Sequence, residues 1–274
     1  MKFSNNFNLK RNKKEGRYKR FLKVAYFVTR QTLPMYSHKK SPHIYSLPQL
    51  ISCVLLKIYM KNMSYRDLEE FLLSSGEMCR VLGLRRIPNY STFCRALSRI
   101  SGKGIKRLLG KVLEVVISSR GLGFLFTCDS TGFKEDVAGF YYALRSGKKR
   151  KRWIKVWYLL DTRTQALVSQ VVGRGPSGDS WGLCKLEKNS PIRSLIEVME
   201  GGFNGSGNMR FGLPIRVIPS IRRGGGIKSW NRILAYMVYR VSKWMGIYGK
   251  GWLCETINSV IKRKFGDTIL FFSP

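Results

Sequence analysis

With 274 residues, 44% of them hydrophobic, the chain is long enough to bury a core and to form one or two domains. Fifty Lys and Arg against sixteen Asp and Glu give a net charge of +34, so a compact fold repels itself unless a polyanion such as nucleic acid is bound. The six scattered cysteines form no Cys-x-x-Cys pair and no apolar run is long enough to span a bilayer, which argues against a zinc site, a disulfide framework and a membrane protein. We expect a cytoplasmic protein associated with the nucleoid.

Residues 1–45 are predicted to form a basic arm. The first forty positions contain twelve Lys or Arg and a single acid, Glu15. Segments of this composition are often disordered until they meet a phosphate backbone.

Residues 46–120 are predicted to form an all-helical DNA-binding domain. Ser46, Ser64 and Ser91 are suitable N-caps, and Asp67 completes a short capping box with Ser64. The predicted helices run over residues 49–60, 65–73, 92–100 and 105–118.

Arg95 and Arg99 lie four residues apart and therefore on one face of the third predicted helix. Short helices joined by tight turns, one of them presenting arginines, are typical of a helix-turn-helix-like DNA reader. An ordinary helical bundle with solvated arginines explains this segment equally well.

Residues 121–274 are predicted to form an α/β domain. The strand candidates are 124–128, 153–160, 166–172, 195–199 and 215–221, and helices are expected around 183–186 and over 230–265 with a break near 246–251. The turn Asp161–Thr164 would join the second and third strands as a hairpin. Strands first, a helix later and an acid at the end of the first strand indicate a ribonuclease-H-like domain.

The positions of the acids are informative because there are so few of them. Asp129 directly follows the first predicted strand, where a carboxylate could bind Mg²⁺ or merely cap a turn. Glu255 would share a helix face with Tyr248, Trp252, Ser259 and Lys262. A half-buried, salt-bridged helix is the alternative interpretation of that face.

Two further acids are candidates for a site between Asp129 and Glu255. Glu200 follows the strand candidate 195–199, and Asp179 lies in the loop Gly178–Ser180. Either could supply a middle ligand, whereas Asp161 is expected to be a turn residue.

A dense basic stretch separates the first two predicted strands. Seven of the eleven residues from Arg145 to Lys155 are cations, and no acid offsets them. We expect a contact with the DNA backbone rather than a solvated hairpin loop, through Lys148, Lys149, Arg150, Lys151 and Arg152.

Several segments together resemble the insertion-sequence transposases of the DDE class that carry a Tyr-Arg-Glu-Lys signature, and the resemblance covers roughly residues 40–265. They are Tyr45–Leu50, Met63–Leu68, Ile87–Phe93, Cys128–Gly132, Gly173–Ser180 and the helix around Glu255.

The resemblance implies a ribonuclease-H-like fold whose acidic triad binds two Mg²⁺ ions, for which Mn²⁺ can substitute. Asp129 matches the first acid, Glu200 the middle one and Glu255 the last. Tyr248 and Lys262 match the signature tyrosine and lysine, which would contact or orient the DNA end. The implied activity is cleavage of double-stranded DNA at transposon ends and strand transfer into target DNA, by a homodimer that brings two ends together.

The chain departs from the family pattern at two positions. The middle acid is normally Asp but is Glu200 here, and the signature arginine is replaced by Gly251. A carboxylate displaced by on the order of 1 Å can cost about 10²-fold in rate. A catalytically inactive DNA-binding derivative of such an enzyme therefore remains the alternative, followed by a ribonuclease-like or RNA-binding protein of the same fold.

Overall fold

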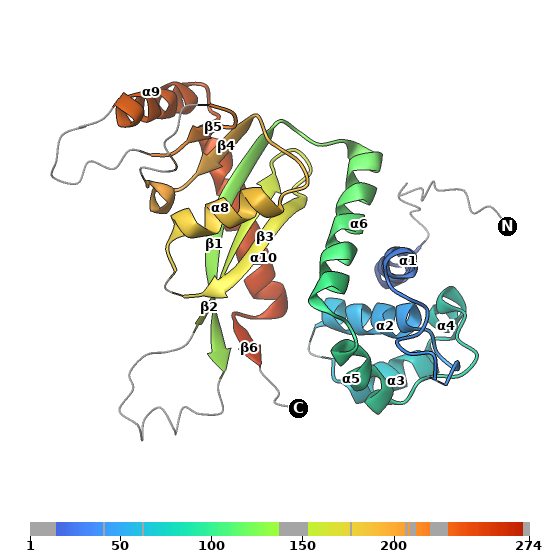
Figure 1. Cartoon of the computed structure of the whole chain (residues 1–274). Coiled ribbons are helices and arrows are strands. Elements are labelled where there is room, and N and C mark those ends of the chain that lie inside the picture. Colours follow the sequence, from blue (N-terminus) through green and yellow to red (C-terminus); the bar gives the residue numbers. More distant parts are fainter. Residues whose placement is uncertain are drawn as a thin grey trace, which may run out of the picture. The chain divides into compact units, whose positions relative to one another are not determined.

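The computed structural model describes residues 15–40, 42–61, 63–136, 153–175, 177–205, 208, 212–219 and 230–270. The chain divides into two compact units, Met1–Ser119 and Arg120–Pro274. The first is helical and the second is a mixed α/β unit (Figure 1). No helix in the described part of the chain is both long and apolar enough to cross a membrane.

The first unit is a set of helices around one apolar core. They are α1 (Arg17–Thr32), α2 (Leu47–Met60), α3 (Tyr65–Ser74), α4 (Gly76–Leu82), α5 (Tyr90–Ser98) and α6 (Gly102–Arg120). The core is made chiefly by α2, whose leucines and isoleucines pack with Leu22, Leu68, Leu72 and Phe93, all fully buried.

The predicted N-caps of α2 and α3 are confirmed and that of α5 is wrong. The Ser46 and Ser64 side chains accept bonds from the backbone N–H groups of Gln49 and Asp67, whose side chains reach back to the cap residues. In α5 the cap is Asn89, whose side chain accepts from the Ser91 N–H at 3.1 Å. Ser91 therefore lies inside the first turn, because an Asn two residues earlier already satisfies its free N–H.

The expectation of an unstructured basic arm is wrong for residues 17–32, which form α1. Leu22, Ala25 and Val28 recur every three residues and are buried against the core, while the cations lie on the other faces of the helix. The high charge of the segment hides this narrow apolar stripe. Residues 1–14 of the expected arm lie outside the described residues.

The second unit is built on a six-stranded mixed sheet in the order β3-β2-β1-β4-β5, with β6 paired to the far end of β1. The strands are β1 (Leu125–Asp136), β2 (Trp153–Asp161), β3 (Leu167–Arg174), β4 (Ile196–Met199), β5 (Ile215–Val217) and β6 (Thr268–Leu270). The predicted hairpin is confirmed as the antiparallel pair β2–β3. Asp161 is its fully buried turn residue, whose carboxylate accepts bonds from the N–H groups of Gly123 and Thr164.

The first strand does not end at Asp129, as the sequence predicted, but continues to Asp136. Antiparallel pairing with β2 extends to Lys134 opposite Trp153, and β6 adds parallel pairing at Lys134–Asp136. The pairing of β1 with β4 covers only Leu125–Cys128 of β1. Asp129 therefore lies inside a long strand, at the place where its pairing with β4 stops.

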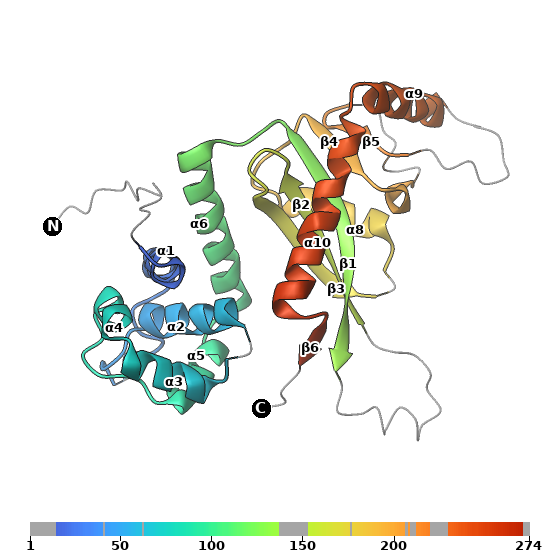
Figure 2. The same ribbon diagram turned by 180° about the vertical axis from the view of Figure 1, so that it is seen from behind.

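Two helices cover opposite faces of this sheet, as the two views in Figures 1 and 2 show. They are α8 (Asp179–Asn189) and α10 (Trp252–Phe265). Neighbouring residues of β1 contact different helices: Ser130 bonds Asp179 of α8, and Asp129 bonds Asn258 of α10. Alternation along β1 thus decides which residues face which helix.

The C-terminal helical region breaks where the sequence predicted. α9 (Trp230–Trp244) is followed by the 3-10 helix η2 (Tyr248–Gly251) and then by α10. A second 3-10 helix, η1 (Gly201–Phe203), directly follows Glu200.

Candidate active site

Asp129 is a buried carboxylate on the face of the sheet that α10 covers. It is 5% exposed. Its Oδ1 accepts from its neighbour, the Ser130 N–H, at 2.6 Å, and its Oδ2 accepts from the Asn258 amide at 2.7 Å. Burial raises the pKa of Asp129, the two hydrogen bonds oppose the rise, and the charges of Asp179 and Glu255 add to it. The carboxylate is thus held in a fixed orientation beside other acids.

Glu200 lies beside Asp129 because of the strand register. Cys128 and Met199 are the last paired residues of the parallel β1–β4 ladder. Asp129 and Glu200 directly follow them, at the ends of this pairing on two adjacent strands. The side chain of Glu200 is exposed at this end of β4. Its pKa is raised by partial desolvation and then by the charges of Asp129, Glu255 and Asp179.

Glu255 approaches the same face from the first turn of α10. Its neighbour Cys254 is buried, with Sγ 3.0 Å from the Thr127 hydroxyl of β1, which fixes this turn of α10 against the sheet. Glu255 itself is exposed. Its charge adds to the raised pKa values of Asp129 and Glu200, so Glu255 lies within electrostatic range of these two acids.

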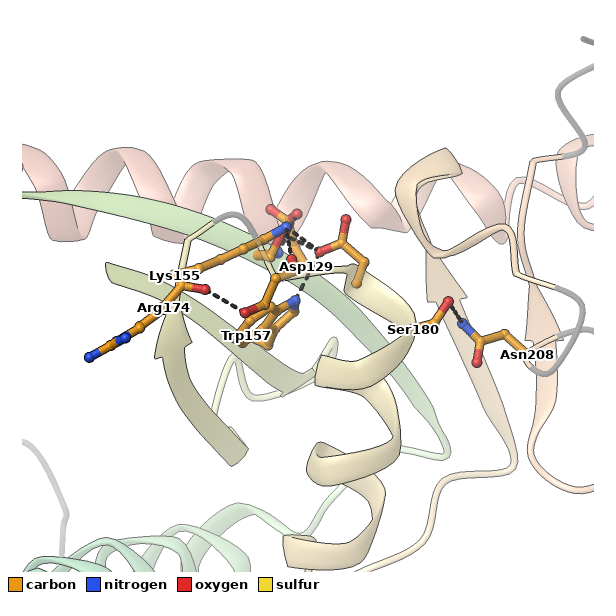
Figure 3. Close-up of polar contacts among 9 residues, drawn as sticks. Asp129, Lys155, Trp157, Arg174, Ser180 and Asn208 are labelled. Carbon is orange, nitrogen blue, oxygen red and sulfur yellow. Dashed lines mark hydrogen bonds and ion pairs between the residues drawn. The ribbon is translucent and has the colours of Figure 1, made fainter. Parts of the chain in front are cut away.

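Asp179 lies on the other face of the sheet and is held by the fold. Its Oδ1 accepts hydrogen bonds from Ser130 Oγ at 2.9 Å and Trp157 Nε1 at 2.8 Å, and pairs with the Lys155 amine at 2.7 Å. Figure 3 shows the side chains of Lys155 and Trp157 close to Asp129. A methyl group on Gly202 would lie 2.6 Å from Oδ2, so the backbone after Glu200 closes the other side.

A divalent metal ion fits the chemistry of the acids that share the α10 face. Within the described ranges, no three Asp, Glu, His or Cys side chains are close enough together to hold a metal ion. Asp129, Glu200 and Glu255 nevertheless offer only carboxylate oxygens, the ligands that Mg²⁺ and Mn²⁺ prefer. Burial is the main cause of the raised pKa values of Asp129 and Glu200, the charges of the neighbouring acids add to it, and a bound cation would offset both effects.

Tyr248 precedes α10 instead of lying on it, which corrects the expectation of a single helix face from residue 248 to residue 262. The 3-10 helix η2 holds it, and its ring packs edge-on against Tyr239 with centroids 4.9 Å apart. Burial raises the pKa of Tyr248, with further contributions from Tyr239, Glu200 and Glu255, so the phenol lies near the acids. Gly246, whose φ is +70°, turns the chain after α9 and so places Tyr248 before α10.

Lys262 lies on α10, two turns after Glu255, as predicted. Its amine is 5.9 Å from the ring centroid of Phe133 on β1. Gly251 has helical dihedral angles (φ −56°, ψ −30°), and a Cβ there would only make ordinary contact with Val198, at 3.5 Å. The fold therefore has room for the beginning of a side chain at the position of the signature arginine.

The other predicted DNA contacts are distributed over both units. Arg95 and Arg99 are exposed in the last turn of α5 and at its C-cap. The basic residues 148–152, on the connection between β1 and β2, lie outside the described residues.

Sequence reasoning missed the residues that support the site. Asn258 follows Glu255 by three positions, so helix spacing could have suggested it, whereas Tyr158 is opposite Asp129 only through the pairing of β2 with β1. The role of Lys155 has no sequence signal of its own, because this residue ends a basic run whose composition predicts contact with DNA.

Comparison with known proteins adds no relative: neither a protein-family model nor a curated protein matches this chain.

Proposed function

We propose that this protein is a DDE-class transposase that cuts double-stranded DNA at the ends of an insertion sequence and joins them to target DNA. The observation that carries the proposal is the arrangement of three acids. Asp129 and Glu200 directly follow the last paired residues of β1 and β4, and Glu255 lies on the turn of α10 that contacts β1. In a chain with a net charge of +34 and only sixteen acids, three carboxylates within electrostatic range of one another require a specific reason.

The fold of the second unit supports a ribonuclease-H-like domain. Its first acid lies on the central strand β1, a β-hairpin follows, parallel strands come next, and a late helix brings the last acid to the same face. This is the order of elements that the sequence pattern predicted.

The residues divide the work of phosphoryl transfer in the following way. Asp129, Glu200 and Glu255 would hold Mg²⁺, which supplies Lewis-acid stabilisation of the charge that develops on the phosphate. Asn258 keeps the Asp129 carboxylate oriented through its 2.7 Å hydrogen bond. Tyr248 lies near Glu200 and Glu255, Lys262 lies further along α10 beside Phe133, and both would orient the DNA end.

Asp179 is less suited than Glu200 to be the middle acid. Its Oδ1 already accepts two hydrogen bonds and an ion pair on the α8 face, whereas the Glu200 carboxylate is exposed beside Asp129. The helical unit, with Arg95 and Arg99 on α5, would bind the phosphate backbone. A homodimer follows from the need to hold two DNA ends at once.

The experiment compares the natural chain with a Glu200→Asp, Gly251→Arg variant on labelled duplexes that tile the DNA flanking its gene, with Mg²⁺. We expect the double variant to cut more strongly, because it restores both family residues and the site at 251 accepts a Cβ. Adding Glu255→Gln should abolish cutting and leave binding unchanged. Asp267→Asn, the same chemical change on an acid paired with Lys134, is the matched control and should still cut.

If no variant cuts although all bind, a catalytically inactive DNA-binding derivative replaces the transposase. Preferential cleavage of RNA–DNA hybrids would instead point to a ribonuclease. Loss of binding together with cutting in Glu255→Gln would contradict the role given to this residue.

A further inference from the structure

The outer face of α8 carries a stripe of exposed side chains that the catalytic proposal does not use. Four exposed residues lie on one side of this helix: Trp181 and, three, four and seven positions after it, Cys184, Lys185 and Lys188. The opposite side of the helix, with Leu183 and Leu186, is buried against the sheet. We call these four exposed residues the α8 stripe.

Trp181 is exposed and yet held in place. Its side chain is 46% exposed, and its ring lies against the fully buried Trp157 with centroids 5.3 Å apart and planes at 59°. The indole also packs closely against Gly173 of β3, since a Cβ at that position would come within 3.2 Å of it. Trp157 in turn donates to Asp179. A flat aromatic surface fixed in this way loses little side-chain freedom when it binds a ligand.

The charge on the stripe is positive. The Lys185 amine is 5.8 Å from the Trp181 ring centroid, and Lys188 follows less than one turn later. The two acids of α8 point elsewhere: Asp179 pairs with Lys155, and Glu187 pairs with Arg216. The lysines of the stripe are therefore not offset by an acid of their own helix.

We propose that the α8 stripe binds single-stranded DNA, with one unpaired base stacked on Trp181 and the neighbouring phosphates on Lys185 and Lys188. Aromatic side chains beside cations are the usual way in which proteins hold unpaired strands without reading their sequence. A duplex hides its base faces and could use only the lysines. A second copy of this chain, at +34, would bring the same cations and repel the stripe.

This binding surface lies on the α8 face of the sheet, away from the α10 face of the catalytic acids (Figures 1 and 2). The inference rests on the nucleic-acid part of the proposed function and not on catalysis. It can therefore be tested in EDTA, where no metal-dependent cleavage takes place.

The test measures the affinity of the full chain for a labelled 20-nucleotide oligo-dT and for an abasic strand of the same length. We expect the natural chain to prefer the strand with bases. Trp181→Ala should weaken oligo-dT binding roughly tenfold and remove this preference, while Trp181→Phe should retain most of it. Trp244→Ala, which removes an 87% exposed tryptophan of α9, is the matched control and should change neither affinity.

Lys185→Ala should leave the preference for bases intact and lower the slope of log affinity against log salt by about 0.7, as expected for one lost phosphate contact on a single strand. The proposal is overturned if Trp181→Ala binds oligo-dT as the natural chain does, or loses the abasic strand equally. Tight binding of polyglutamate that depends on Trp181 would also overturn it, in favour of an acidic protein partner. None of these outcomes depends on whether the protein cuts DNA.

Discussion

Removing the Asp179 carboxylate should destabilise the second unit far more than removing an exposed acid. In Asp179→Ala, the Trp157 N–H loses its acceptor in a site where the indole is fully buried, and the Lys155 amine loses its counter-ion. A buried donor left without a partner costs about 1–3 kcal/mol. Breaking a buried ion pair by removing one partner costs about 3–5 kcal/mol.

The two costs overlap because one oxygen, Oδ1, serves both donors, and the pair is not completely buried: the Lys155 and Asp179 side chains are 15% and 18% exposed. We therefore expect a loss of about 3–4 kcal/mol in the free energy of unfolding, which is the lower part of the ion-pair cost alone and less than the sum of the two costs. Asp179→Asn keeps an acceptor oxygen and loses only the charge, so about half of that loss is expected.

Tryptophan fluorescence is the appropriate assay, because all six tryptophans lie between Trp153 and Trp252 and so report on the second unit only. Urea unfolding of the natural chain, Asp179→Ala and Asp179→Asn gives the two differences directly. Asp267→Asn, at an ion pair whose side chains are 74% and 49% exposed, is the control and should change stability by less than about 1 kcal/mol.

The reasoning is refuted if Asp179→Ala unfolds within about 1 kcal/mol of the natural chain. If that variant also lost metal-dependent cleavage, Asp179 would be the middle catalytic acid and Glu200 would not. A large loss of stability with cleavage retained per folded molecule would support the structural role.

Two other substitutions test the packing of this unit. Burial raises the pKa of Glu197 from 4.5 to about 7, so the contribution of this carboxyl group to stability is complete below pH 4.5 and is lost as the pH rises through 7. Glu197→Gln should remove this pH dependence, which amounts to up to about 3 kcal/mol in the free energy of unfolding measured from pH 4 to 8. Gly182→Ala places a methyl group 2.4 Å from the Trp157 indole and should lower the melting temperature seen by circular dichroism, against the usual gain from Gly→Ala in a helix. Gly110→Ala on α6, where nothing lies within 4 Å, is its control and should raise the melting temperature; the same sign for both variants would contradict the packing argument.

Features set by neighbouring residues could be predicted from the sequence. The capping boxes at Ser46 and Ser64 need only residues three positions apart, and the Asp161 turn needs only its own four residues and the strands beside it. The break between α9 and α10 follows from the glycines at 246, 249 and 251. Local hydrogen bonding and backbone freedom decide these features, and both can be read along the chain.

Other features depended on segments far apart in the sequence. The apolar stripe of α1 became visible only through its burial against α2, since its cations dominate the composition. β1 extends beyond Asp129 because β2 and β6 satisfy its backbone there, a pairing that no local pattern reports.

The arrangement of the acids was also decided by tertiary structure. The sequence singled out Asp129, Glu200, Glu255 and Asp179 as candidates and left the choice of a middle acid open. Strand alternation sends Asp129 to the α10 face and Ser130, with its partner Asp179, to the α8 face. The Asn258 amide that orients Asp129 comes from 129 residues away. Residue types and their spacing determine which side chains can take part in the site. The pairing of distant strands and helices decides which of them meet, because only the folded chain brings their charges and hydrogen-bonding groups within reach of one another.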